Sequence, residues 1–213
     1  MDTAVRFPTS PKPARAAPLK LNKRMSVEEA FQAIVRNCIG QVQDKAAGMV
    51  RSPDSEFLHQ MRVALRRLDA AFSLFGELVP VPPVIAHELE WLQEQLGPAR
   101  DWDIFVESTL ARVSRAIPDN TELESLRAAA GEQRAHANAR ANDAISSPRF
   151  SRLVGAVENW ADQRRWRDDI SGKHKTRLKM RIADFAARKQ AGQAVKVIAV
   201  KMRDEDAANL RDA

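Results

Sequence analysis

The residues best suited to chemistry in this chain lie in one short segment, HQMRVALRRL at 59–68. On a helical wheel one arc of this region is polar and holds His59, Arg62, Arg66, Asp69 and Ser73. The adjoining arc is apolar and holds Leu58, Met61, Leu65, Leu68, Phe72 and Phe75. Guanidinium groups stay charged and match phosphate oxygens, so the polar arc suits phosphate binding. A solvated helix face without a specific role is the alternative interpretation.

A second segment, LGPARDWDIF at 96–105, places charges where a packed helix is usually apolar. Arg100, Asp103 and Glu107 fall close to the arc of leucines on the same helix. Because partly buried charges need partners, two interpretations stay open. These residues form ion pairs, among themselves or with a neighbouring helix, or the acids orient the arginines of both segments toward a ligand.

Helix start and stop signals place the two segments on successive helices. Ser26 and Glu29 form a capping box that predicts a helix ending near residue 47. Ser52 and Pro53, a cap followed by proline at the first helical position, predict the start of the next helix, which continues to Phe75. The 59–68 segment therefore belongs to the second helix.

The third helix follows a proline-rich turn at 80–83 and is expected to be interrupted or kinked at Gly97 and Pro98 before it continues to Leu110. A second capping box, Thr121 with Glu124, predicts a fourth helix that reaches residue 145. Ser147 and Pro148 predict the start of a fifth helix, whose apolar side holds Phe150, Leu153, Val154, Val157 and Trp160.

These helices and their short connections predict an all-α fold, an antiparallel helical bundle, because no pair of alternating strands with a hairpin turn occurs. Residues 1–24 are rich in proline and carry six basic residues and one acidic residue. We expect them to form a disordered basic arm. The helical domain then spans residues 25–213.

The composition bounds the class of protein and of partner. The chain has 213 residues and a net charge of +6, and residues 149–203 hold 15 basic and 5 acidic residues, which favours a polyanionic partner. The single Cys38 excludes an internal disulfide and a cysteine-based zinc site. No apolar run is long enough to span a membrane and no signal-peptide pattern opens the chain. We therefore expect a cytoplasmic protein with no membrane partner.

Together and in this order, HQMRVALRRL and LGPARDWDIF resemble the CHAD domain, the conserved histidine α-helical domain. The resemblance covers roughly residues 26–187. It implies two pseudo-symmetric helical bundles around a basic channel that binds inorganic polyphosphate, and association with polyphosphate granules. By this resemblance the polyphosphate-binding residues are His59, Arg62, Arg66, Arg67 and Arg100, and the orienting residues are Asp101 and Asp103.

The chain departs from the family pattern in two places. Asp69 stands where the family usually has another basic residue, and no string matches the family's second His/Arg helix. KHKTRLKMRIAD at 173–184 repeats the offsets of the first His/Arg helix, which we interpret as chance in so basic a stretch. We expect its Lys173, Lys175, Arg177 and Arg181 to form a secondary basic surface.

We therefore expect one bundle and a partial second one, truncated before the second His/Arg helix. Such a chain would leave the channel open on one side, with apolar and cationic surface uncovered. We expect that the chain either forms a homodimer that covers the channel or binds its ligand more weakly than a complete domain does.

Two other functions compete with polyphosphate binding. Nucleic-acid binding through the basic tail would use the same phosphate electrostatics, although the chain has no Tyr and no base-reading motif. A metal-dependent phosphohydrolase would use His59 or His87 with nearby acids, but His87 is not followed by a second histidine at metal-binding spacing. We therefore predict a binding module that is not an enzyme and needs no metal or cofactor.

Overall fold

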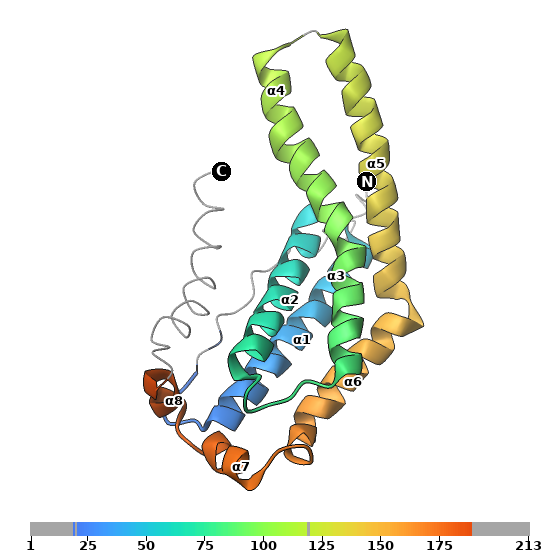
Figure 1. Cartoon of the computed structure of the whole chain (residues 1–213). Helices are drawn as coiled ribbons and strands as arrows, with labels where there is room; N and C mark the ends of the chain where they lie inside the picture. The colour runs from blue at the N-terminus through green and yellow to red at the C-terminus, as the bar shows by residue number, and fades with distance from the viewer. Residues whose placement is uncertain (1–18, 20, 119, 189–213) are drawn as a thin grey trace, which may run out of the picture.

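The computed structural model describes residues 19, 21–118 and 120–188, and these residues form an all-α structure (Figure 1). The α-helices are α1 (Val27–Arg51), α2 (Ser55–Phe75), α3 (Pro83–Ile104), α4 (Ala111–Ala116), α5 (Thr121–Ser146), α6 (Pro148–Asp162), α7 (Gly172–Leu178) and α8 (Ile182–Arg188). A π-helix, η1 (Phe105–Leu110), joins α3 to α4, and a 3-10 turn, η2 (Arg165–Arg167), follows α6. Within the described residues no strand occurs, so the all-α prediction is confirmed.

The helix starts follow local capping chemistry. Ser26 and Glu29 form the predicted capping box of α1, and Ser147 caps α6 with Pro148 at its first position, as predicted. The predicted start of α2 at Ser52 is wrong by two residues, because Asp54 is the cap and its carboxylate accepts a hydrogen bond from the Glu56 amide at 2.9 Å.

Two further details differ from the expectation. The cap of α5 is Asn120, whose side chain accepts a hydrogen bond from the Leu123 amide at 2.9 Å, and not Thr121. The helix is not interrupted at Gly97 and Pro98, since α3 continues through the exposed Pro98 to residue 104. The irregular turn is η1, farther along the same helix.

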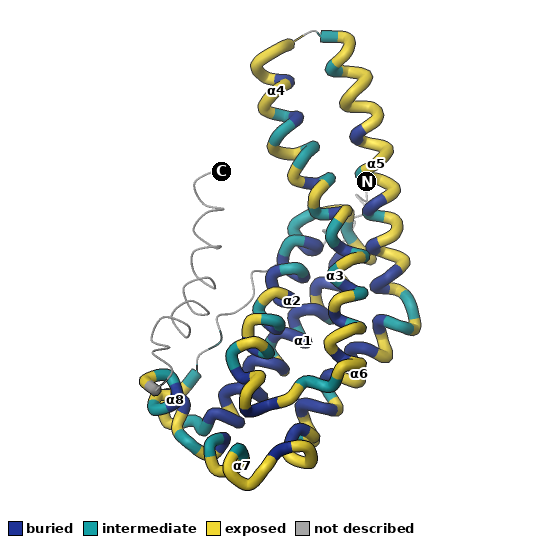
Figure 2. Tube along the Cα trace, in the orientation of Figure 1, coloured by how far each residue is buried: buried dark blue, intermediate teal, exposed yellow. Residues whose placement is uncertain are grey.

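The core lies between α1 and α2 and is closed by α6 and the segment after it (Figure 2). The apolar arc expected for α2 is buried, because Leu58, Met61, Leu65, Leu68 and Phe75 are at most 2% exposed. Phe31 of α1 lies at the centre of an aromatic cluster, with ring-centroid distances of 5.3 to 6.2 Å to the rings of Phe72, Phe75, Trp160 and Trp166. This burial fixes the orientation of α2 and therefore of its polar arc.

The last described segment docks against the beginning of α1. The Val27 amide donates to the Met180 carbonyl and the Ile182 amide donates to the Met25 carbonyl, both at 2.8 Å. Phe185 of α8 stacks on Phe75 of α2 with ring centroids 5.6 Å apart. Segment 173–184 is divided between α7 and α8, so its charged residues do not share one helix face.

The ends of the chain lie largely outside the described residues, including most of the predicted disordered arm at 1–24 and residues 189–213 of the basic tail. Leu19 and Leu21, at the end of the predicted arm, are partly buried against the core. Among the described helices, none combines the length and the apolar character that a membrane crossing needs.

Candidate anion-binding site

The polar arc of α2 meets α3 at the glycine of the LGPARD sequence. Arg62 is partly buried, and its Nη1 lies 3.5 Å from the point where a Cβ on Gly97 would stand. The Arg62 guanidinium group therefore lies against α3 at Gly97, at van der Waals distance from where that Cβ would be. The contact joins the two segments that the sequence identified separately.

The charges around Arg62 come from the residues expected to act with it. Burial lowers the pKa of the Arg62 guanidinium, Asp101 opposes that shift, and the like charges of Arg66 and Arg100 add to it. We call Arg62, Arg66 and Arg100 the arginine cluster. Burial and the charges of Arg66 and Arg100 thus disfavour the charged form of Arg62, and Asp101 favours it. An anion bound beside Arg62 would also favour the charged guanidinium.

Asp69 links the two helices beside the arginine cluster. Its Oδ2 accepts a hydrogen bond of 2.9 Å from Gln93 of α3. Burial raises the pKa of the Asp69 carboxyl, and the hydrogen bond from Gln93 opposes this effect. Asp69, the acid at a position where the family usually has a basic residue, is thus partly buried and connects α2 to α3 through this hydrogen bond.

His59 and Arg67 have different positions relative to the arginine cluster. His59 is partly exposed and precedes Arg62 by three residues, which places it on the same face of α2. Arg67 lies near Cys38 of α1, and its Nε is buried and has no hydrogen-bond partner among the described residues. The charges of Arg66, Arg100 and Asp101 therefore act on Arg62, whereas Arg67 lies on another side of α2, near α1.

Asp103, expected to orient the arginines, contacts a different helix. It is completely buried, and its Oδ1 accepts hydrogen bonds from Arg134 Nε at 2.7 Å and Asn138 Nδ2 at 3.4 Å, both on α5. Arg134 also pairs with Glu107 of η1. Asp103 and Glu107 thus form the expected ion pair with a neighbouring helix, and Asp103 holds α5 against α3.

A scan against family models matches the CHAD domain over residues 33–213. The chain belongs to the CHAD domain family. A crystal structure of the CHAD domain from the plant Ricinus communis is similar to it, with a TM-score of 0.69 and 30% sequence identity over 90% of this chain and 70% of that chain. No curated protein matches the chain.

In this CHAD domain several arginines of the basic region after Pro148 are paired with acids from elsewhere. The carboxylate of Glu28, 5% exposed, accepts hydrogen bonds from Trp166 Nε1 at 3.0 Å, from Arg167 Nε at 2.6 Å and from Arg164 at 3.3 Å. We call these four residues the Glu28 node. Burial raises the pKa of Glu28. The hydrogen bonds and charges of its partners together lower the pKa by more than burial raises it, so the net shift is downward.

The secondary basic surface is only partly available. Lys173 and Lys175 are exposed, whereas Arg177 lies 4.0 Å from Glu77 and Arg181 pairs with Asp184 at 3.0 Å. The positive surplus counted along the sequence therefore overstates the field of this region, because acids from distant segments offset part of it.

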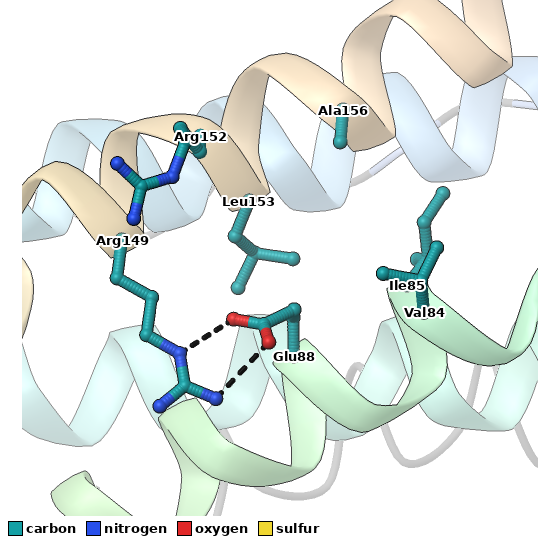
Figure 3. Close-up of a pocket in the computed structure, with 7 residues that line it drawn as sticks. All are labelled: Val84, Ile85, Glu88, Arg149, Arg152, Leu153 and Ala156. Carbon is teal, nitrogen blue, oxygen red and sulfur yellow. Dashed lines mark hydrogen bonds and ion pairs between the residues drawn. The ribbon is translucent and has the colours of Figure 1, made fainter.

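A groove between α3 and α6 was not found from the sequence. It has a volume of about 330 Å³ and is lined by Val84, Ile85, Glu88, Arg149, Arg152, Leu153 and Ala156 (Figure 3). Glu88 accepts two hydrogen bonds from Arg149, at 2.6 and 3.0 Å, and the same guanidinium lies 4.0 Å above the ring of Trp91. Glu88 and Arg149 are 61 residues apart, so no local pattern indicated their pairing.

No group of three or more histidine, cysteine or acidic side chains in the described part of the chain has a geometry that would hold a metal ion. Glu88, the acid next to His87, is engaged by Arg149.

Proposed function

We propose that this CHAD domain binds inorganic polyphosphate at the arginine cluster and acts as a binding module without catalysis. The observation that carries the proposal is the position of Arg62, which is partly buried and whose positive charge is disfavoured by burial and by Arg66 and Arg100, and favoured by Asp101. Such a guanidinium gains from an anion that replaces its lost hydration. Polyphosphate, the ligand linked to the family, is a linear anion that would contact several arginines at once. Association with polyphosphate granules would follow from this binding.

Nucleic acid carries the same kind of charge, but the aromatic residues do not favour it. Single-stranded binders stack bases on exposed aromatic rings. Here Trp160 and Trp166 are buried in the core, Trp91 lies beneath Arg149, and Trp102 is partly buried with its ring against Phe105. These positions support a ligand that is recognised by its phosphates alone.

The test is a titration with long-chain polyphosphate and, in parallel, with duplex DNA of equal total charge, at two salt concentrations. Arg62→Ala combined with Arg66→Ala should weaken polyphosphate binding at least tenfold. Each charge-assisted contact is worth about 1.5–3 kcal/mol, and a tenfold loss needs only about 1.4 kcal/mol. Circular dichroism should stay unchanged, because the apolar arc of α2 provides the packing.

The matched control removes two exposed arginines elsewhere, Arg140→Ala with Arg165→Ala. This pair should cause a small loss that disappears at high salt, as expected for distant screened charges. Arg164 is unsuitable as a control because it contacts the buried Glu28. Equal losses from both double variants, or tighter binding of DNA than of polyphosphate, would contradict the proposal.

A further inference from the structure

One part of the molecule has helical structure but little core. We define the arm as residues 111–117, which include α4, and residues 121–132 at the beginning of α5. It extends beyond the rest of the bundle (Figure 1), and most of its surface is exposed (Figure 2). None of residues 121–129 is buried, and the first buried residue of α5 is Ala130.

The arm and the end of α3 hold most of the exposed large apolar side chains of the described residues. Six large hydrophobic residues of the described chain are exposed, and four lie here. Val113 is 38% exposed, Ile117 51% and Leu126 47%, and Ile104 at the end of α3 is 45% exposed. Clustered exposed apolar side chains mark an interaction surface, whereas single ones carry no such meaning.

The low intrinsic stability of the helices in the arm also supports an interaction surface there. A short helix that buries no apolar face is marginal in water, because most helical stability in proteins comes from tertiary packing. The arm contains a six-residue helix, α4, and more than two turns of α5 without a buried residue. Packing against another surface would supply the burial that the arm lacks within one chain.

The charges of the arm indicate which surface that is. The exposed charges of α4 are basic, Arg112 and Arg115, whereas those at the beginning of α5 are mainly acidic, Glu122, Glu124 and Glu132, with Arg127 paired to Glu124. A second copy presents the same two helices. In a two-fold arrangement each residue pair occurs twice, so α4 of each copy would face the beginning of α5 of the other.

We propose that the arms of two copies of this chain pair about a two-fold axis, with α4 of each copy against the beginning of α5 of its partner. Val113, Ile117 and Leu126 become buried in this interface, and the basic and acidic side chains pair across it. The arginine cluster lies on α2 and α3, outside the arm. The inference is therefore independent of the proposed function.

Analytical ultracentrifugation of the full chain over a range of protein concentrations tests this interface. The wild type should approach twice the 23.8 kDa of one chain as its concentration rises. Ile117→Asp with Leu126→Asp should weaken self-association at least tenfold. The control Val84→Asp changes a side chain that is 67% exposed but lies on α3, and it should leave association unchanged. A wild type that stays monomeric at its highest soluble concentration, or a Val84→Asp loss equal to that of the arm variant, would overturn the proposal.

A charge exchange tests the pairing of α4 with α5 without changing apolar residues. Arg112→Glu with Arg115→Glu should prevent self-association, and so should Glu122→Lys with Glu124→Lys. Mixed in equal amounts, the two variants should associate again. All four positions are exposed, and circular dichroism of each variant should match that of the wild type. Failure of the mixture to associate would overturn the two-fold arrangement.

Discussion

The arginines of the cluster and the arginines of the Glu28 node differ in the acids that surround them. At the Glu28 node one buried carboxylate receives two guanidinium groups and an indole N–H, and the partners lower its pKa. At the arginine cluster the main acid near Arg62 is Asp101, while Arg66 and Arg100 add positive charge, and the Arg62 pKa is lowered. The acid of the first arrangement has its partners within the fold, and we propose that the second arrangement is stabilised by an external anion.

Because of this contrast, a count of basic residues along the sequence does not locate the proposed anion site. Arg164 and Arg167 belong to the most basic stretch of the sequence, yet their charge serves to attach the segment after α6 to α1. Arg62 belongs to a part of the chain with more acidic than basic residues. The local balance of cations and carboxylates in the folded chain distinguishes the two roles.

The largest expected effect is a loss of stability when Glu28 is removed from the Glu28 node. Glu28→Ala leaves the buried Trp166 N–H and two guanidinium groups without their acceptor, and it should lower the free energy of unfolding by about 2–3 kcal/mol, less than for a fully buried pair because the arginines are partly exposed. Urea denaturation measures this loss. Polyphosphate affinity should change less than twofold.

The pH dependence of the same variant supplies a second readout. Because the folded pKa of Glu28 is below its unfolded value, its stabilisation is present above the unfolded pKa and is lost as pH falls through the folded pKa. The difference between wild type and Glu28→Ala should therefore shrink on acidification. Glu90→Ala, at an exposed position on α3, is the control and should cost less than about 0.5 kcal/mol. Equal stabilities of the wild type and Glu28→Ala would contradict the structural role.

A smaller effect distinguishes two neighbouring arginines. Arg66→Ala should weaken polyphosphate binding about fivefold, or ~1 kcal/mol, because it removes one of the cations of the arginine cluster that would contact phosphate oxygens. Arg67→Ala should change affinity less than twofold and instead destabilise the fold by about 1 kcal/mol, because the side chain packs toward α1 near Cys38. Parallel titrations and urea denaturation measure both. A loss of affinity for Arg67→Ala as large as that for Arg66→Ala would place Arg67 in the binding site.

The smallest expected effect concerns Asp69. Asp69→Asn keeps an acceptor for Gln93 but removes a negative charge from the polar arc, so polyphosphate affinity at pH 7 should rise about twofold, equivalent to ~0.4 kcal/mol. The folded pKa of Asp69 is raised, so the stability that it contributes is present below the unfolded pKa and lost as pH rises through the folded pKa. The variant should therefore gain stability relative to the wild type as pH rises. Weaker polyphosphate binding by Asp69→Asn would show that this carboxylate supports the site.

The sequence predicted the features that depend on local chemistry. The capping box at Ser26, the proline start at Pro148 and the buried arc of α2 each follow from spacing within one helix, and all three are present. The start of α2 was misplaced because Asp54 competes with Ser52 for the cap within the same turn. The π-helical turn η1 has no pattern that distinguishes it from the helix before it.

Contacts between distant segments were the part that the sequence did not predict. The proximity of the arginines of α2 and α3 was expected from a family resemblance, whereas the partners of Asp103 and Glu28 lie 31 and 139 residues away on elements chosen by tertiary packing. Asp103 follows Arg100 by three residues, so its position on the helix is also compatible with an acid that orients that arginine. Only the position of α5 shows that its partner is Arg134.

The arginine cluster is tested most directly by a crystal structure of the chain with tripolyphosphate bound. We expect ordered phosphate oxygens within hydrogen-bond distance of the guanidinium groups of Arg62, Arg66 and Arg100. Arg67 and the Glu28 node should keep their present contacts. Phosphates ordered at Lys173 and Lys175, with none at the arginine cluster, would contradict the account.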